Sequence, residues 1–465
     1  MKLDKFKKIL FMWLTRIGHY FITLVLLAIF VVFILLLIPD IHNLWTNDIY
    51  SQYNTTQLND MGFFDNERYL LSALIQSLAA TIALVITLSL VAVQLAAQSY
   101  SPRVIDVYKR NPDMWILLCI YIITIFYGLG LTKIIGLGIL GNYMEGAIFV
   151  AYFMGFFAFV CLVPYMLKTL DLLKPSCLMG ILADEITKEN VIALADFSSN
   201  NKKQNDKIQP IVEVINFALD RNDTETVLNG FMIIQKRTTS ILEDSFFEKK
   251  EEDKFSKYII YHIMSIWIRG AEKNTDSTLA TIDCLGKIAI KAATKKYAIT
   301  VLRVSKSLQD IGTKSIELNN GFEVEFLAGA LKAIGTKAIE KETRVCSIKE
   351  TGIRDDFISE KVVENLRLLA QKSINPNLLI AKLEILNSLH MIAIKATEKS
   401  FKYTATVAIK GLIESVPAKD ESNDIAQSIK ESLNELRDKI KGKEWDNLET
   451  EISTALNKIK ESETK

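Results

Sequence analysis

The sequence predicts an all-α membrane protein in which four transmembrane helices precede a cytosolic helical domain. The chain of 465 residues combines a mean hydropathy of +0.20 with 23% charged residues, so its apolar and charged residues must be segregated. The apolar residues are concentrated between Ile17 and Leu173. The remainder is rich in charges and helix formers, has few prolines and lacks the alternation of β-strands.

Four apolar stretches are long enough to cross a bilayer. A hydrocarbon core of about 30 Å needs roughly 20 apolar residues as a helix, because backbone groups in lipid must be hydrogen-bonded within their own segment. We predict a transmembrane domain over residues 1–173, with spans at about 17–38, 69–97, 114–140 and 147–170. The first stretch follows basic residues but is too long for a signal-peptide core, so we expect a retained anchor.

The basic residues predict the orientation of these spans. Lys and Arg are frequent before the first span, between the second and third, and after the fourth, whereas the two other short loops contain only Arg68 and Lys133. Basic flanks stay in the cytosol. We therefore expect a multi-pass protein of the cell membrane with both termini cytoplasmic.

The rest of the chain divides into a connector and linker (174–209), a repeat-like helical domain (210–427) and charged amphipathic helices (428–465). Similar segments begin at Leu285, Leu308, Leu331 and Leu389. Each has a small residue at the same place, which suits stacked helices in a solenoid-like array, with a helix bundle as the alternative. These small residues are Ala289, Gly312, Gly335 and Ala393. The last helices could self-associate or pack back on the domain.

Polar residues share one face of the second span. On a helix with 100° per residue, five of them fall within about 80° of each other. They are Ser72, Gln76, Thr87, Gln94 and Gln98. Hydroxyls and amides can line a water-filled pathway in an oligomer, although small and polar side chains also serve helix packing.

The segment after this span carries a resemblance to a known family. Gln94, Leu95 and Ala96 are followed by Ser101, Pro102 and Arg103. This pattern resembles a prokaryotic family of predicted membrane proteins, classed as a domain of unknown function, whose hallmark is a Q-L-A segment followed by S-P-R. The resemblance implies a multi-helix membrane region over about Lys7 to Leu173 and implies no activity or ligand.

Two loops at the membrane surface contain further candidate residues. Ser101 can cap a helix that starts with Pro102 and Arg103, and this loop either couples membrane and cytosol or is an ordinary basic anchor. Lys133 with Gly136 and Gly138 either lines an outer vestibule or serves close packing. The glycines formally match G-x-G-x-x-G, but they lack the strand and helix that a dinucleotide site requires.

No motif indicates catalysis. The five cysteines form no C-x-x-C pair, the four histidines are dispersed, and nucleophile elbows and phosphate-binding loops are absent from the sequence. We expect no enzyme activity, metal site or cofactor, and the net charge of +1 argues against nucleic acid as a partner. The leading hypothesis is a homo-oligomeric pore in the lipid bilayer with a cytosolic gating or sensing domain. The alternative is a non-conducting scaffold or sensor that recruits a cytosolic protein.

Overall fold

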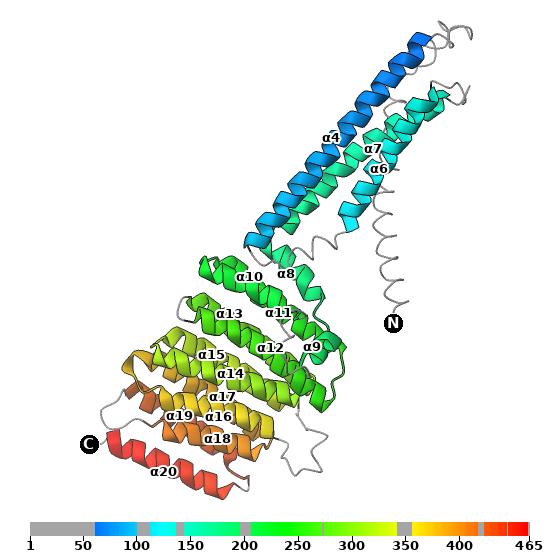
Figure 1. The fold of residues 1–465 in the computed structure, drawn as a ribbon. Helices are drawn as coiled ribbons and strands as arrows, with labels where there is room; N and C mark the ends of the chain where they lie inside the picture. The colour runs from blue at the N-terminus through cyan, green and yellow to red at the C-terminus, as the bar shows by residue number, and fades with distance from the viewer. Residues whose placement is uncertain are drawn as a thin grey trace, which may run out of the picture. The chain divides into compact units, whose positions relative to one another are not determined.

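The computed structural model describes most of the chain as two compact units, and each is considered by itself. The described residues are 61–99, 112–135, 144–195, 206–271, 274–341, 356–416, 423–443 and 445–463. The units meet in sequence between Lys174 and Pro175. All regular structure in these residues is helical (Figure 1), which confirms the predicted all-α class.

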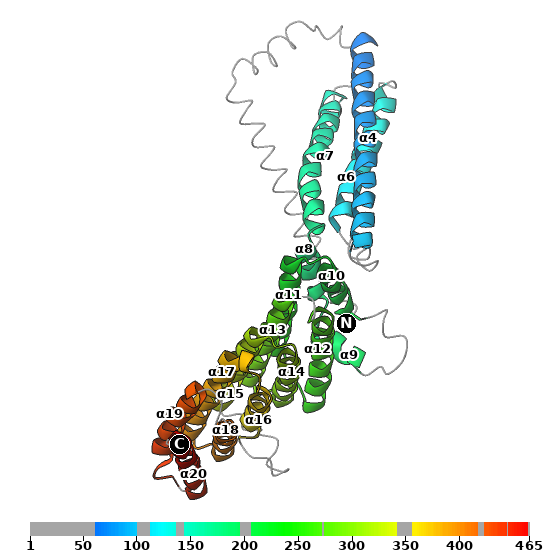
Figure 2. The ribbon, with the colours of Figure 1, turned by 90° about the vertical axis from the view of Figure 1, so that its left-hand side faces the viewer.

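The first unit contains three long apolar helices, α4 (Met61–Ser99), α6 (Pro112–Ile135) and α7 (Met144–Leu172), which pack against one another (Figure 2). Their segments Asn66–Leu95, Asp113–Ile135 and Gly146–Leu172 are long and apolar enough to cross a membrane. They correspond to the second, third and fourth predicted spans. The first predicted span, residues 17–38, lies outside the described residues, as does the predicted extension of the third span beyond Ile135.

Two glycines allow the three helices to approach closely. A Cβ atom at Gly155 of α7 would lie 2.8 Å from a methyl carbon of Leu74 on α4, and one at Gly128 of α6 would lie 3.0 Å from Ile75. The cores around these contacts contain Leu78, fully buried, among other apolar side chains. Small residues at helix crossings in membranes gain dispersion contacts that larger side chains would block.

The Gly155 contact gives a testable prediction. Gly155→Leu should destabilise the three-helix unit by about 2 kcal/mol, because overpacking a tight contact forces neighbouring side chains out of their rotamers. Gly146→Leu on the same helix is the matched control, since no atom lies within 4 Å of a Cβ there. Thermal unfolding in detergent, followed by circular dichroism, should show a lower midpoint for Gly155→Leu only. Equal midpoints would contradict the close packing.

Polar side chains also join the three helices. Tyr152 of α7 donates to Glu67 of α4 at 2.9 Å, and Ser89 of α4 lies 2.9 Å from the hydroxyl of Tyr165 on α7. Tyr127 of α6 donates to a backbone carbonyl of α7 at 3.0 Å. Such contacts orient apolar helices that hydrophobic packing alone leaves free to rotate.

The second unit is a stack of helices. In chain order these are α8 (Pro175–Asp184), α9 (Lys188–Ala195), α10 (Gln209–Asp220), α11 (Thr224–Asp244), α12 (Lys249–Gly270), α13 (Thr275–Thr294), α14 (Ala298–Glu317), α15 (Gly321–Glu340), α16 (Phe357–Lys372), α17 (Leu379–Glu398), α18 (Lys402–Glu414), α19 (Asn423–Ile440) and α20 (Asp446–Glu463). A short 3-10 turn, Pro376–Leu378, precedes α17.

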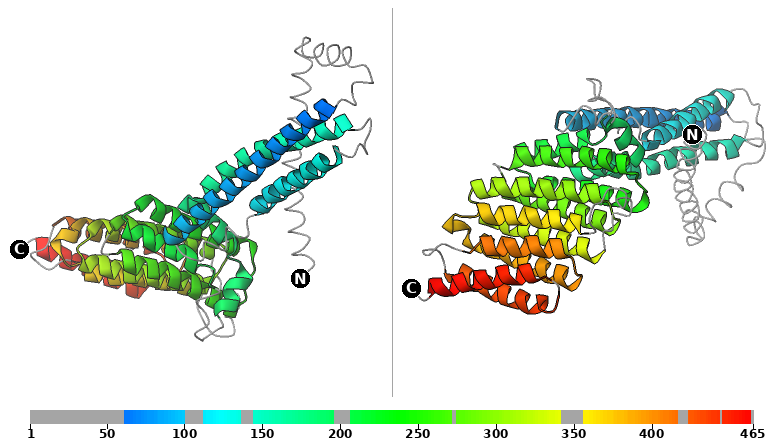
Figure 3. Two further views of the ribbon diagram at one scale, coloured as in Figure 1. Left: turned by 45° about the horizontal axis from the view of Figure 1, so that its top comes forward. Right: turned by 90° about the horizontal axis from the view of Figure 1, so that it is seen from below.

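These helices form two layers (Figure 3). From α10 onward each helix packs on the second helix after it, so that α11, α13, α15, α17 and α19 form one layer and the even-numbered helices form the other. Two helices within the predicted connector, α8 and α9, pack on α10, α11 and α12. The charged C-terminal helices α19 and α20 pack back on α17 and α18, which was one of the two predicted alternatives for them.

Four of the turns share one backbone geometry. Asn222, Lys296, Asn319 and Ser400 each adopt a positive φ between 54° and 65°. The N–H after each of them bonds to a carbonyl five residues earlier, as Tyr297 does to Ala292 at 2.9 Å. This is the Schellman arrangement that ends helices. Asparagine enters the left-handed region with little strain, whereas Lys296 and Ser400 enter it less readily.

The small residues of the sequence repeat lie in this interior. Ala289, Gly312, Gly335 and Ala393 are all buried. A Cβ at Gly312 would lie 2.9 Å from Leu369 of α16, and a Cβ at Gly335 would lie 3.0 Å from Ile392 of α17. The glycine positions are therefore points where helices of the stack approach closely.

Candidate functional site

The polar face of α4 is the first candidate site. Gln76, Thr87, Gln94 and Gln98 are exposed on the surface of the three-helix unit and Ser72 is half-buried. The opposite face of α4 packs on α6 and α7 through Leu71, Leu78 and Val85, which are 0 to 4% exposed. None of the five residues lies on the packed side of α4.

The polar stripe lies in the middle of the exposed face of α4. On a helical wheel of 100° per residue, its apolar flanks lie on both sides, with Leu84 and Leu88 about 80° to 120° away from Gln76 and Ile86 about 80° away in the other direction. These three leucine and isoleucine side chains are 47 to 62% exposed. From Ser72 to Gln98 the stripe extends about 39 Å at 1.5 Å per residue, which exceeds the bilayer core.

Within the helix the stripe is only weakly hydrogen-bonded. Thr87 donates to the carbonyl of Ala83 at 2.9 Å, and Gln76 donates to Ser72 at 3.4 Å. The hydroxyl of Thr87 thus satisfies its donor locally. The amide groups keep hydrogen-bonding capacity for water or for another helix.

The other sequence candidates are placed only in part. Ser101, Pro102, Arg103, Gly136 and Gly138 lie outside the described residues. Lys133 lies in the last turn of α6 and is exposed, so the predicted coupling loop and outer vestibule stay predictions.

One ion pair in the first unit was not predicted. Asp113, in the first turn of α6, is 1% exposed and pairs with Lys168 of α7. An acidic residue favours a helix N-terminus because it interacts with the helix dipole. The sequence signal was available, since Asp113 directly follows the proline that starts α6. The sequence does not predict the contact with Lys168, because that contact depends on how α6 and α7 align.

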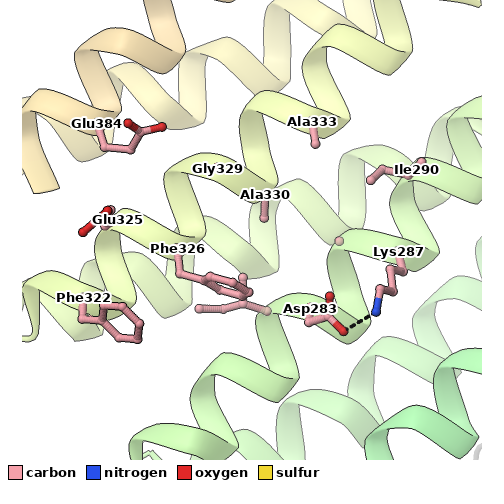
Figure 4. A pocket seen from close by; sticks show the side chains of 12 residues that line it. Asp283, Lys287, Ile290, Phe322, Glu325, Phe326, Gly329, Ala330, Ala333 and Glu384 are labelled. Carbon is pink, nitrogen blue, oxygen red and sulfur yellow. Dashed lines mark hydrogen bonds and ion pairs between the residues drawn. The ribbon is translucent and has the colours of Figure 1, made fainter.

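A groove on the second unit is the second candidate site (Figure 4). It has a volume of about 440 Å³ and lies between α13 and α15, with Glu384 of α17 at its rim. Phe322 and Phe326 project from α15, and Gly329, Ala330 and Ala333 follow on the same face. No atom lies within 4 Å of a Cβ at Gly329, so the hollow is open at that point. The groove is apolar and suits an apolar or amphipathic ligand.

The surroundings of the groove are also apolar. Large apolar side chains that are 42 to 71% exposed recur on the outer face of α11, α15 and α17. They are Leu228, Met232, Phe322, Phe326, Ile380 and Met391. In the opposite layer, α12 and α18 expose Tyr261, Ile268 and Tyr403, whereas α14 and α16, both fully described, carry no exposed large apolar residue. An apolar patch of this extent on one face is typical of an interaction surface.

A buried polar cluster lies at the start of α10. Asp206 accepts hydrogen bonds from the hydroxyl of Tyr258 and, at 3.0 and 3.1 Å, from the N–H groups of Ile208 and Gln209. Its other oxygen lies 3.2 Å from Nε2 of His262, which is 3% exposed. Burial alone would raise the pKa of Asp206, but the hydrogen bonds and charge of His262, with those of Tyr258 and Gln209, lower it to about 2.

Two other buried carboxylates, Glu252 and Asp356, bond to the first turns of neighbouring helices. Glu252 of α12 accepts hydrogen bonds from the N–H of Thr300 at 2.7 Å and from its hydroxyl at 3.1 Å. Burial raises the pKa of Glu252, and the bonds from Thr300 oppose that rise. Asp356 contacts Thr404 at the start of α18 in the same way, with its carboxylate 3.1 Å from the N–H. These acids satisfy free N–H groups of helix ends and are structural.

Among the described residues, no group of three or more His, Cys, Asp or Glu side chains could hold a metal ion. The carboxylates Asp206, Glu252 and Asp356 and the buried His262 take part in polar contacts within the helical stack. The polar stripe of α4 and the apolar groove are the two surfaces that suit a functional role.

Taken together, the apolar helices and the helical stack define an all-helical membrane protein with a large domain outside the apolar region. Residues 16–229 match the family model described as "Predicted membrane protein (DUF2254)". The match confirms the resemblance seen in the sequence, and the family is one of unknown function.

Two further comparisons give little. No curated protein matches the chain. A solved structure described as "Circular tandem repeat protein with novel repeat topology and enhanced subunit contact surfaces" aligns over 87% of this chain and 97% of its own, with 13% identity and a TM-score of 0.38. A likeness this low does not define a shared fold.

Proposed function

We propose that the protein is an oligomeric membrane pore in which the polar face of α4 lines a water-filled pathway. The observation that carries this proposal is the position of the stripe: its residues occupy the centre of the exposed face of α4, while the apolar side of the helix packs on α6 and α7. Amide and hydroxyl groups can replace the hydration of an ion without a buried charge.

The length of the stripe supports a pathway across the membrane, and exposed Leu90 is an apolar interruption at the same helical angle as Ser72. A length of about 39 Å is sufficient to cross the hydrocarbon core of about 30 Å. A single copy with three or four spans is too small to enclose a channel, so several copies of α4 would surround the pathway. The basic flanks favour a cytosolic second unit, which would act as a gate or sensor.

The apolar groove favours a second candidate function. In that case the protein is a non-conducting scaffold, and the helical stack recruits a cytosolic protein through its apolar layer. The exposed side chains Phe322 and Phe326 beside Gly329 support this alternative, because aromatic side chains beside a hollow are common at binding surfaces.

Cysteine accessibility tests the pore. Single cysteines are placed at Thr87 and Gln94 of α4, and at Leu88 as a control on the apolar flank. Cys119, an exposed free cysteine of α6, is replaced by serine in every variant. In liposomes, a charged thiol reagent should modify Thr87→Cys and Gln94→Cys at least about tenfold faster than Leu88→Cys, because the thiolate that reacts forms only in contact with water.

Two results would contradict the pore. Thiols at Thr87 and Gln94 that stay unmodified would leave helix packing as the role of the stripe. A detergent-solubilised protein that is monomeric would favour the scaffold. If the thiols do react, reconstituted vesicles should pass ions, and modification at Thr87→Cys should reduce that flux.

A further inference from the structure

The exposed face of α15 has an unusual order of side chains. Its first two turns carry Phe322 and Phe326, which are 62% and 42% exposed. The next two turns carry Gly329, Ala330 and Ala333, which leave the hollow of the groove (Figure 4). The exposed face of α15 therefore has large side chains at one end and an open space at the other.

This order is self-complementary. When two such helices cross antiparallel at Gly329, Phe326 of each copy meets the space beside Ala333 of the other. Small residues at the centre of the crossing allow the two backbones to approach. A two-fold axis requires the same patch on both copies. The exposed face of α15 meets that requirement, because it carries both the projecting phenylalanines and the hollow that receives them.

The charged residues beside the exposed face of α15 are also complementary in this antiparallel crossing. Glu325 and Lys332 lie on the same flank of α15, and in an antiparallel pair of helices equal flanks face each other. The crossing at Gly329 brings Glu325 of each copy opposite Lys332 of the other. Among the described residues Glu325 makes no ion pair, whereas Lys332 pairs with Glu384 of α17 at 2.9 Å. The contact would place Lys332 between two carboxylates.

We infer that the groove of the second unit binds the same groove of a second copy of this chain, through an antiparallel crossing of α15 at Gly329. The contact buries Phe322 and Phe326 in two copies and adds two charge pairs at its edge. The neighbouring helix α17 extends the apolar face, since Ile380 is 71% exposed and Met391 is 47% exposed. This interface does not depend on α4 and is separate from the proposed pore.

Disulfide formation in the full-length protein tests this interface. A cysteine at Gly329 has space for its side chain, since no atom lies within 4 Å of the Cβ, and at a two-fold crossing it meets its own copy. Lys306→Cys on α14, in the opposite layer, is the matched control. With Cys119 replaced by serine, mild oxidation in detergent should cross-link Gly329→Cys at least about tenfold faster than Lys306→Cys, because docking gives the two thiols a high effective concentration.

A second pair of variants tests specificity. Phe322→Asp should suppress cross-linking at Gly329→Cys, whereas Tyr261→Asp should leave it unchanged. Tyr261 is 68% exposed, close to the 62% of Phe322, but lies on α12 of the other layer. Circular dichroism of each variant establishes that the stack is folded.

Three outcomes would overturn the inference. Equal rates at the two cysteines would mean random collision, and cross-linking that survives Phe322→Asp would mean a contact that does not bury Phe322. A Gly329→Cys variant that forms no dimer but is shielded from thiol reagents would assign the groove to a different partner. None of these results bears on thiol accessibility at Thr87, so failure of this interface and failure of the pore are distinguishable.

Discussion

Asp206→Ala is expected to destabilise the second unit by about 3 to 5 kcal/mol, because removal of one partner of a buried charged cluster leaves the others without compensation. His262 and Tyr258 would lose the carboxylate that accepts their hydrogen bonds, and two N–H groups at the start of α10 would lose their acceptor. Thermal or urea unfolding of the full-length protein, followed by circular dichroism, measures the change.

Asp220→Ala at the other end of α10 is the matched control. Asp220 pairs with Arg269 at 2.5 Å, and the two side chains are 38% and 50% exposed. Exposed pairs contribute about 0 to 1 kcal/mol, so this substitution should have little effect. Equal losses from both variants would mean that the Asp206 cluster is not a main contact between α10 and α12.

The same cluster predicts a pH dependence. The pKa of Asp206 is lowered from 3.8 to about 2 in the folded protein. A carboxyl group with a lowered pKa stabilises the fold above its unfolded value and loses that contribution as the pH falls through the folded value. The stability difference between the wild type and Asp206→Ala should therefore shrink by about 2 kcal/mol between pH 5 and pH 2.

The sequence was sufficient for the features that depend on one segment. The apolar length of α4, α6 and α7 predicted three spans within the described residues, and the helical period placed Gln76 and Gln94 on one face. The spacing of small residues predicted that Gly312 and Gly335 would lie in tight helix contacts. Each of these inferences uses only the geometry of a single helix.

The remaining features depend on how distant helices align. Asp206 and His262 are separated by four helix turns of α12 and the whole of α10 and α11, so no local pattern pairs them. The pairing of Asp113 with Lys168 likewise needs the register between α6 and α7. The groove arises because α13 and α15 are neighbours in one layer. The sequence does not show which helices share a layer, so it does not reveal that Phe322 is exposed.

Gly312→Leu is expected to lower the stability of the second unit by about 3 kcal/mol, since added carbons in a tightly packed core force neighbouring side chains and backbone to move. A Cβ at this position would lie 2.9 Å from Leu369 of α16 and 3.2 Å from Leu327 of α15. The substitution must therefore displace the side chains of two helices at once. The better helix propensity of leucine offsets only about 1 kcal/mol of this loss.

Gly180→Leu is the control for the change in helix propensity, because Gly180 lies in α8 with no atom within 4 Å of a Cβ. It should be neutral or slightly stabilising in the same unfolding experiment. Gly335→Leu should resemble Gly312→Leu in direction, because the two glycines hold equivalent positions in their repeats and Ile392 lies 3.0 Å from a Cβ at Gly335. If both tolerated leucine as Gly180 does, the small residues would not mark the helix crossings, and the stacking of α14 on α16 and of α15 on α17 would be wrong.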